Sequence, residues 1–367
     1  MESFNSSKSI SPQPHGEWTI MVYMDGDNNL EKYALSNLNR MEKVDLPSNV
    51  HVTFMLDRSP NFCKLDGDWS DTRVGIVSHD LYTKTITSSM EDVGELNMGN
   101  PDTLTSFINW STEVAPAEHY ALILWDHGGG VEGTCWDFSS NYDNLTISEI
   151  QRAIENSNVD KFDLIGFDAC LMSDVDVAFG LKDVTDFLVM SQAEEPATGW
   201  NYTKWLSIFN YTTNPSPALL AKAAAITYDH FYRYPVTMSV IDTSKADELL
   251  DSMGNFADDL LAQPTDVYDL IDAVKETKQF DKEYVDFYQL MNNLIAQDIS
   301  PALSQDALDT INVLDEMVVY NAGGMHNANG ISLYFPEEPM PDYTPDNFDW
   351  LKTTGWGEVY DDIWAII

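Results

Sequence analysis

Two side chains suited to nucleophilic chemistry stand at the ends of two apolar segments. His127 follows the run Ala121-Leu-Ile-Leu-Trp-Asp, and Cys170 closes the run Asp163-Leu-Ile-Gly-Phe-Asp-Ala, 43 residues further on. A thiol is a strong nucleophile only as the thiolate, and a nearby imidazole can take its proton. The two residue types therefore predict a nucleophile, Cys170, and its general base, His127.

The elements that carry these residues are predicted to be neighbouring strands. Both segments are continuously apolar, which is typical of parallel strands whose two faces are covered. Ligands of such sheets bind just beyond the carboxyl ends of the strands. The interval between the segments has room for one crossover helix, so we expect the imidazole and the thiol to meet at one sheet edge.

Three glycines, Gly128, Gly129 and Gly130, follow the histidine. Without side chains, this stretch lets a substrate backbone approach closely. Catalysis at a carbonyl group also needs donors for the oxyanion that forms on it. We expect the N–H of Gly128 to be one donor and the N–H of Cys170 to be the second.

Each of these residues also has an ordinary structural interpretation. His127 is then a turn histidine after a core strand, and Cys170 is a small buried hydrophobe, as most free cysteines are. The glycines and the pairing of the two motifs favour catalysis. Cys135 and Cys63 are weaker candidates for the nucleophile, because neither has a sequence context that defines a niche for a reactive thiol.

A carboxylate, Asp168, precedes Cys170 by two residues. Side chains two residues apart in an extended chain point to the same side, so Asp168 is expected near the nucleophile. We interpret it as the charged floor of a pocket that pairs with Arg or Lys of a substrate. The alternative is an N-cap for the following helix. Asp126 would point the other way and is expected to be structural.

The composition is strongly acidic. The 367 residues include 60 Asp and Glu against 19 Lys and Arg, a formal charge of −41. Binding to nucleic acid or to an anionic membrane needs a basic surface, so both are excluded as main functions. An acidic surface keeps a protein in solution, and it also favours partners or substrates with basic residues.

The cysteine count and the N-terminus bear on location. Three cysteines make no disulfide framework. The first 16 residues are polar and lack the apolar core of a signal peptide, and no stretch reaches the roughly 18 apolar residues that span a bilayer. The sequence therefore predicts a soluble protein without membrane insertion, either cytoplasmic or secreted after removal of a leader.

Strand and helix patterns alternate along much of the chain. Strands are expected at 18–23, 50–56, 120–125, 162–167, 187–190, 236–241 and 330–335, with a hairpin at 66–87. Helices are expected at 30–41, 101–114, 217–232, from the capping box Thr146-Ile-Ser-Glu149 onward, and successively through 245–296. This alternation predicts an α/β fold with a mostly parallel central sheet and helices on both faces. We expect a disordered tail at 1–16, a core domain at 17–243 and a helical C-terminal region at 244–367 that returns strand 330–335 to the core.

The sequence resembles the clostripain family of cysteine peptidases, in the clan of caspases, gingipains and legumains. The motifs that carry the resemblance are Trp125-Asp-His127-Gly-Gly-Gly130, Gly166-Phe-Asp-Ala-Cys170-Leu-Met172 and Met21-Val-Tyr-Met24-Asp-Gly-Asp27-Asn-Asn-Leu-Glu31. Weaker matches are Ser191-Gln-Ala-Glu-Glu195-Pro196, Gly199-Trp200-Asn-Tyr202 and Gly330-Ile-Ser-Leu-Tyr-Phe-Pro336. The resemblance implies a caspase-like three-layer α/β/α sandwich, a dyad of His127 and Cys170, and an endopeptidase that cleaves after Arg or Lys because of Asp168. The Gln-Ala-Cys signature of caspases is absent, which argues against cleavage after Asp.

Autocatalytic cleavage, which is common in the family, needs a basic residue after the catalytic histidine. Relatives are often cut autocatalytically at a basic residue after the histidine, but the segment 131–146 has none, and Arg152 is the first beyond it. We therefore expect no such self-cleavage here, with activity as a single chain or maturation by another route.

Some relatives use calcium. The turn Asp25-Gly-Asp27-Asn-Asn29 offers oxygen ligands but lacks the Gly and Glu of an EF-hand, so a helix cap is favoured. No cofactor is expected to be required, and calcium is the one candidate.

Two other functions fit parts of the sequence. A caspase-like scaffold that binds cationic peptides without cleaving them would share the fold and the acidic pocket. A metal-dependent hydrolase would need a tight ligand cluster such as His-Glu-x-x-His, which the sequence lacks. We favour the cysteine peptidase.

Overall fold

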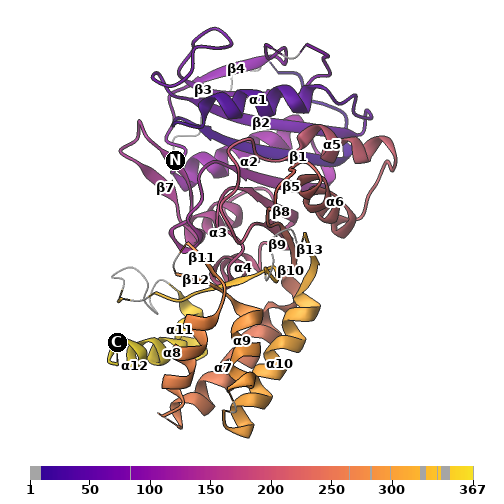
Figure 1. Ribbon diagram of the computed structural model, residues 1–367. Coiled ribbons are helices and arrows are strands. Elements are labelled where there is room, and N and C mark those ends of the chain that lie inside the picture. The colour runs from indigo at the N-terminus through magenta and orange to yellow at the C-terminus, as the bar shows by residue number, and fades with distance from the viewer. Residues whose placement is uncertain are drawn as a thin grey trace.

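The computed structural model describes residues 10–82, 84–263, 265–281, 283–297, 299–322, 328–336, 338–339 and 348–366. Residues 1–9 of the expected tail therefore lie outside the described residues. Nine strands form one sheet in the order β13-β10-β9-β8-β5-β1-β2-β3-β4 (Figure 1). The strands from β9 to β2 run parallel, and those at both edges are antiparallel. The expected α/β fold with a mostly parallel central sheet is confirmed.

All strands of this sheet except β4 and β13 overlap segments that the sequence predicted to be strands or part of the hairpin at 66–87. The strand bounds are β1 Gly16–Gly26, β2 Val50–Arg58, β3 Thr72–Ile76, β4 Met90–Gly94, β5 Ala117–Trp125, β8 Phe162–Asp168, β9 Thr185–Met190, β10 Ser239–Asp242 and β13 Val318–Asn321. The four middle strands β1, β5, β8 and β9 are almost wholly buried near their carboxyl ends. That burial accounts for their unbroken apolar runs.

Helices cover both faces of the sheet and make it the middle layer of three. One face packs against α1 (Glu31–Glu42), α5 (Tyr202–Leu206) and α6 (Pro217–Asp229). The other face packs against α2 (Pro101–Val114), α3 (Ile147–Glu155) and α4 (Val175–Leu181). The sandwich expected from the sequence is thus present.

Local sequence signals set the ends of several helices. Asn100 caps α2 by accepting a hydrogen bond from the N–H of Asp102, and Pro101 occupies the first turn. Thr146 and Glu149 form the expected capping box of α3, which pairs each side chain with the other's backbone N–H. These caps fix the entry of the crossover helices, and so the direction in which the next strands leave.

The C-terminal region adds a second group of helices below the sheet in Figure 1. These are α7 (Ala246–Leu261), α8 (Val267–Glu276), α9 (Phe287–Ala296), α10 (Pro301–Met317), α11 (Asp349–Thr353) and α12 (Trp356–Trp364). The sequence predicted helices throughout 245–296, but two short strands, β11 (Gln279–Phe280) and β12 (Tyr284–Asp286), interrupt them. The strand expected at 330–335 is β14 (Ser332–Tyr334), and it pairs with β12 in a small three-stranded sheet. The strand that reaches the edge of the main sheet is β13, which the sequence pattern did not single out.

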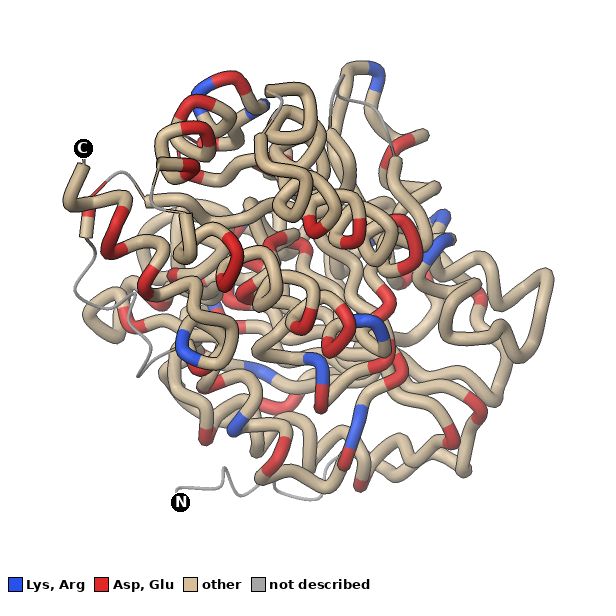
Figure 2. The backbone as a smooth tube through the Cα atoms, turned by 90° about the horizontal axis from the view of Figure 1, so that it is seen from below, with Lys and Arg blue, Asp and Glu red and all other residues tan. Residues whose placement is uncertain are grey.

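Acidic residues are distributed throughout the fold and outnumber the basic ones, as the coloured backbone in Figure 2 shows. No helix in the described ranges is both long and apolar enough to cross a membrane.

Candidate active site

The pairing of β5 with β8 places the two predicted catalytic residues at one edge of the sheet. The two strands are parallel neighbours, in register from Ala121 opposite Leu164 to Trp125 opposite Asp168. One residue beyond the ladder, the N–H of Asp126 donates to the backbone oxygen of Asp168 at 3.3 Å. His127 and Cys170 follow directly on adjacent strands. The expectation from the strand-end rule is therefore met in the geometry.

Gly128 lies against the backbone of Cys170. A Cβ atom at Gly128 would overlap the backbone oxygen of Cys170 and lie 2.9 Å from its nitrogen, so no larger residue fits. Among the described residues, neither the N–H of Gly128 nor that of Cys170 donates to a protein acceptor. Both groups are thus available as oxyanion donors beside the thiol.

The imidazole of His127 is held from the side of β1. Its Nε2 lies 2.8 Å from Oδ1 of Asn29, in the loop that follows β1. An amide oxygen only accepts, so Nε2 carries the proton and Nδ1 is left as the basic nitrogen. Burial lowers the pKa of His127, which keeps the ring neutral at pH 7. This is the protonation state that a general base needs.

The thiol of Cys170 is held from the side of β9. Its Sγ accepts a hydrogen bond from the N–H of Glu195 at 3.2 Å. Burial and the nearby carboxylates of Glu195, Glu194 and Asp168 raise the pKa of Cys170 to about 12. In this conformation the thiol is protonated at neutral pH, and it needs a base or a loss of surrounding negative charge to become a nucleophile.

Asp168 lies at the end of β8 and is buried. Its Oδ2 accepts hydrogen bonds from the N–H of Trp200 at 3.1 Å and from the hydroxyl of Tyr202 at 2.8 Å. The N-cap of α4 is Asp174 and not Asp168, so the helix-cap alternative for Asp168 is wrong. Burial raises the pKa of Asp168 to about 6, against the opposing effect of these hydrogen bonds.

A second buried carboxyl group, Glu195, stands beside Asp168 and was not singled out from the sequence. Both of its carboxyl oxygens are buried, and neither has a hydrogen-bond partner among the described residues. Burial and the Asp168 carboxylate raise the pKa of Glu195 well above its usual value. Glu195 follows Met190, the last residue of β9, by five positions, which is too far for the strand-end rule to single it out. The Arg40 guanidinium is near enough to lower the pKa of Asp168, but no Lys or Arg of the described residues lines the cavity that holds the two carboxyl groups.

Gly199 lines the pocket beside Asp168. Its φ is 67°, and a Cβ atom there would lie 2.7 Å and 2.8 Å from the carboxyl oxygens of Asp168. The backbone oxygen of Gly199 accepts a hydrogen bond from the hydroxyl of Tyr232 at 2.7 Å. Glycine at this position keeps side-chain atoms away from the carboxylate and leaves the pocket open above it.

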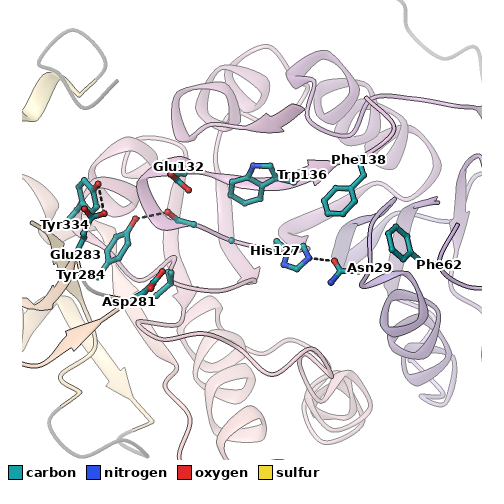
Figure 3. A pocket seen from close by; sticks show the side chains of 13 residues that line it. Asn29, Phe62, His127, Glu132, Trp136, Phe138, Asp281, Glu283, Tyr284 and Tyr334 are labelled. Carbon is teal, nitrogen blue, oxygen red and sulfur yellow. Dashed lines mark hydrogen bonds between the residues drawn. The ribbon is translucent and has the colours of Figure 1, made fainter. Parts of the chain in front are cut away.

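Two cavities meet at His127. The smaller, of about 190 Å³, is lined by His127, Asp168, Cys170, Glu195 and Gly199, among others. The larger, of about 620 Å³, lies on the glycine side of the imidazole and is shown in Figure 3. Cys63 and Cys135 line neither cavity. Cys135 is fully buried, which agrees with the expectation that it is not the nucleophile.

A cluster of carboxylates that the sequence did not predict joins the loop after β1 to β2 and to the segment that follows β4. Oxygens of Asp27, Asp57 and Glu95 lie within 4.8 Å of one another. Among the described residues, Oδ2 of Asp25, Oδ1 of Asp27 and Oδ2 of Asp57 are buried without a hydrogen-bond partner.

The helix-cap interpretation of this loop is wrong. Leu30 is the N-cap of α1 and makes no side-chain cap. The Asp27 carboxylate belongs to the cluster instead, and Oδ1 of Asp25 accepts a hydrogen bond from the N–H of Asp27 at 3.0 Å.

Asp126 has the structural role that the sequence suggested. Its Oδ1 accepts from Nδ2 of Asn28 at 2.6 Å, and its Oδ2 accepts from the N–H of Trp136 at 2.7 Å. These bonds tie the loop of Asn28 and Asn29 to the strand end that carries His127. Through these bonds, Asp126 helps to fix the position of Asn29 relative to the imidazole of His127.

A protein-family model and a curated protein each match most of the chain. The model of the clostripain family, Peptidase C11, matches residues 22–362. Clostripain of Hathewaya histolytica is 26% identical over 393 residues, covering 87% of this chain and 74% of that protein.

Solved structures share the fold. A secreted C11 cysteine protease from Bacteroides thetaiotaomicron, in complex with an irreversible peptide inhibitor, superimposes with a TM-score of 0.72 at 19% identity, covering 93% of this chain and 100% of that one. An inactive zymogen C11 protease from Parabacteroides distasonis gives a TM-score of 0.67 at 20% identity, covering 96% and 99%.

Proposed function

Because the chain belongs to the clostripain family of cysteine proteases, we propose that it is an endopeptidase whose dyad is Cys170 and His127 and which cleaves after Lys or Arg. One observation carries this proposal: the thiol, the imidazole and two buried carboxyl groups line a single cavity of about 190 Å³. Its substrates are peptides and proteins that present basic residues.

The proposed reaction starts with the neutral dyad. Nδ1 of His127 takes the thiol proton as Sγ of Cys170 attacks the carbonyl carbon of the scissile bond. The oxyanion is stabilised by the N–H groups of Gly128 and Cys170. The imidazolium then protonates the leaving amine, and water hydrolyses the thioester with His127 again acting as base.

Specificity follows from the buried acids. Burial raises the pKa values of both Asp168 and Glu195, and the Asp168 carboxylate raises that of Glu195 further. A Lys or Arg side chain in the cavity supplies the missing positive charge, and a charge-assisted hydrogen bond is strong in such a site. A neutral side chain supplies no positive charge and leaves the carboxyl oxygens of Glu195 without a partner, which costs binding energy.

We also propose that the carboxylate cluster of Asp27, Asp57 and Glu95 holds a calcium ion. Buried carboxylate oxygens without donors match the oxygen ligands that calcium prefers. Calcium there would neutralise the carboxylates beneath the loop that carries Asn29. Its role is structural, and the reaction itself uses only the dyad.

The test of the dyad is covalent labelling. A peptidyl-lysine acyloxymethyl ketone should label Cys170, as located by mass spectrometry of tryptic fragments. Cys170→Ala should abolish both labelling and peptide hydrolysis, a loss of at least about a thousandfold in kcat, while circular dichroism shows the fold intact. Cys63→Ala is the matched control and should label normally.

Other outcomes would redirect the assignment. Hydrolysis that survives in Cys170→Ala would move the nucleophile elsewhere. A folded protein that binds the peptide without any label at Cys170 would support the silent scaffold instead. Loss of hydrolysis on chelation in the absence of any change in folding would favour the metal-dependent hydrolase.

A further inference from the structure

The larger cavity beside His127 takes no part in the proposed reaction of Cys170 and His127. It measures about 620 Å³ and is bordered by Asn29, Gly128, Leu171, Asp281 and Glu283, among others. His127 lines it as well as the smaller cavity, whereas Cys170, Asp168 and Glu195 line only the smaller one. The imidazole thus stands on the boundary between two binding spaces.

The position of the imidazole tells which half of a peptide each space receives. The side chain before the scissile bond enters the smaller cavity, where the proposed acidic pocket lies. The imidazole must protonate the leaving amine, so the residues after the scissile bond leave Cys170 on the side of His127. The larger cavity occupies that side.

One wall of the larger cavity combines a carboxylate with an aromatic ring. A Cβ atom at Gly129 would lie 3.1 Å from Oε2 of Glu132 and 3.1 Å from Cη2 of Trp136, so both side chains flank the glycine backbone. Figure 3 shows Phe138 and Phe62 continuing the aromatic surface beyond Trp136. A carboxylate beside an exposed ring face is the arrangement that holds a Lys or Arg side chain by charge and by cation–π attraction.

The opposite wall repeats this combination. Tyr284 donates to the backbone oxygen of Gly129 at 2.7 Å and accepts from the N–H of Val131 at 3.0 Å, which fixes the glycine loop to β12. Its ring lies 5.0 Å from that of Tyr334, whose hydroxyl donates to Glu283 at 3.1 Å. Glu283 and Asp281 are acidic, and the lining formed by the described residues contains no Lys or Arg.

Resting on the proposed function, we propose that this cavity is the binding site for the residues after the scissile bond, and that Glu132, Trp136 and Glu283 select a Lys or Arg side chain there. The enzyme would then prefer sequences with basic residues on both sides of the cut. Clustered basic residues are also the substrates that a protein of charge −41 attracts over a distance.

The experiment compares internally quenched peptides that share Lys before the scissile bond and differ only in the two residues after it. The three peptides carry Lys-Lys, Leu-Leu or Glu-Glu there, and mass spectrometry confirms the cut site. The ratio of kcat/KM for Lys-Lys over Glu-Glu should be about tenfold or more. The double variant Glu132→Gln, Glu283→Gln should reduce this ratio severalfold. Glu113→Gln, an exposed acid on α2, is the matched control and should leave the ratio unchanged.

The outcomes separate this inference from the function on which it rests. Hydrolysis of a peptidyl-lysine aminocoumarin, which has no residue after the scissile bond, tests the proposed function alone. If that substrate is cleaved but the three peptides are cleaved equally, the cavity does not select basic residues and the inference is overturned. If the aminocoumarin is not cleaved, the proposed function has failed first. A preference that persists in the double variant would also contradict the role of these acids.

Discussion

Oδ1 of Asn29 lies 2.8 Å from Nε2 of His127. This bond joins the loop after β1 to the strand end of β5, and it sets which imidazole nitrogen is free. Together with the bond from the N–H of Glu195 to Sγ of Cys170, it means that each proposed catalytic group is held by the strand next to its own. Four adjacent parallel strands thus each supply one member of the site.

Asn29 is accordingly predicted to be a positioning residue. Asn29→Ala should lower kcat by about tenfold to a hundredfold with little change in KM, because the tautomer and orientation of His127 are no longer fixed. Asn29→Asp should raise the pKa of the imidazole, so the acid limb of the kcat/KM profile moves to higher pH. A merely structural role would lower activity equally at every pH, and measurement of both profiles distinguishes the two.

Asp168→Asn should change two activities in opposite directions. The carboxylate of Asp168 contributes to the raised pKa of Cys170, so its removal lowers that pKa and speeds alkylation by iodoacetamide at neutral pH. The same change removes the partner of a basic side chain, so kcat/KM for Lys and Arg peptides falls by about tenfold to a hundredfold. Alkylation that slows together with hydrolysis would show that Asp168 supports the fold instead.

The carboxylate cluster predicts an unusual dependence of stability on pH. Burial and neighbouring acids raise the pKa of Glu95 from 4.5 to about 7, and burial raises the pKa of Asp25 and Asp57. The folded state then holds protons that the unfolded state has lost, so the free energy of unfolding decreases as pH rises from about 4.5 through about 7. In EDTA, the Tm should be lower at about pH 8 than at about pH 5.5.

Calcium should reverse this loss of stability. At about pH 8, millimolar calcium chloride should raise the Tm, because it neutralises the ionised cluster. Asp57→Asn should raise the Tm in EDTA by relieving repulsion, yet shrink the calcium-dependent increase. Asp92→Asn, an exposed acid on β4, serves as the control and should alter neither value. A Tm indifferent to calcium in the wild-type protein would refute the proposed site.

The loop after His127 predicts an enzyme that does not cut itself there. Residues 131–146 contain no Lys or Arg, and the hairpin of β6 (Thr134–Asp137) and β7 (Asp143–Leu145) occupies this segment. Protein labelled by the peptidyl-lysine probe should therefore migrate as one full-length band in a denaturing gel. Conversion to two fragments during incubation, blocked in Cys170→Ala, would show a self-cleavage that the sequence does not foresee.

The sequence predicted the core of the site because long apolar runs reveal buried strands and the residues at their ends. His127 and Cys170 each follow such a run within two residues, so the rule places them accurately. Glu195 lies five residues beyond β9, and the fold of that loop depends on contacts that no periodicity records. The carboxylate cluster was misread for a similar reason, since Asp57 and Glu95 come from distant segments. The short strands β11 and β12 were not predicted, because two or three residues are too few to show the alternation of polar and apolar residues that marks a strand.

The parallel pairing of β5 with β8 has a consequence for chain connectivity. The hydrogen bonds between these strands, and not the loop that links them, hold His127 beside Cys170. We therefore expect two separately produced fragments, divided within the β6–β7 turn, to reassemble into an active heterodimer. An unbroken chain between His127 and Cys170 would then help the protein to fold, but catalysis would not require it.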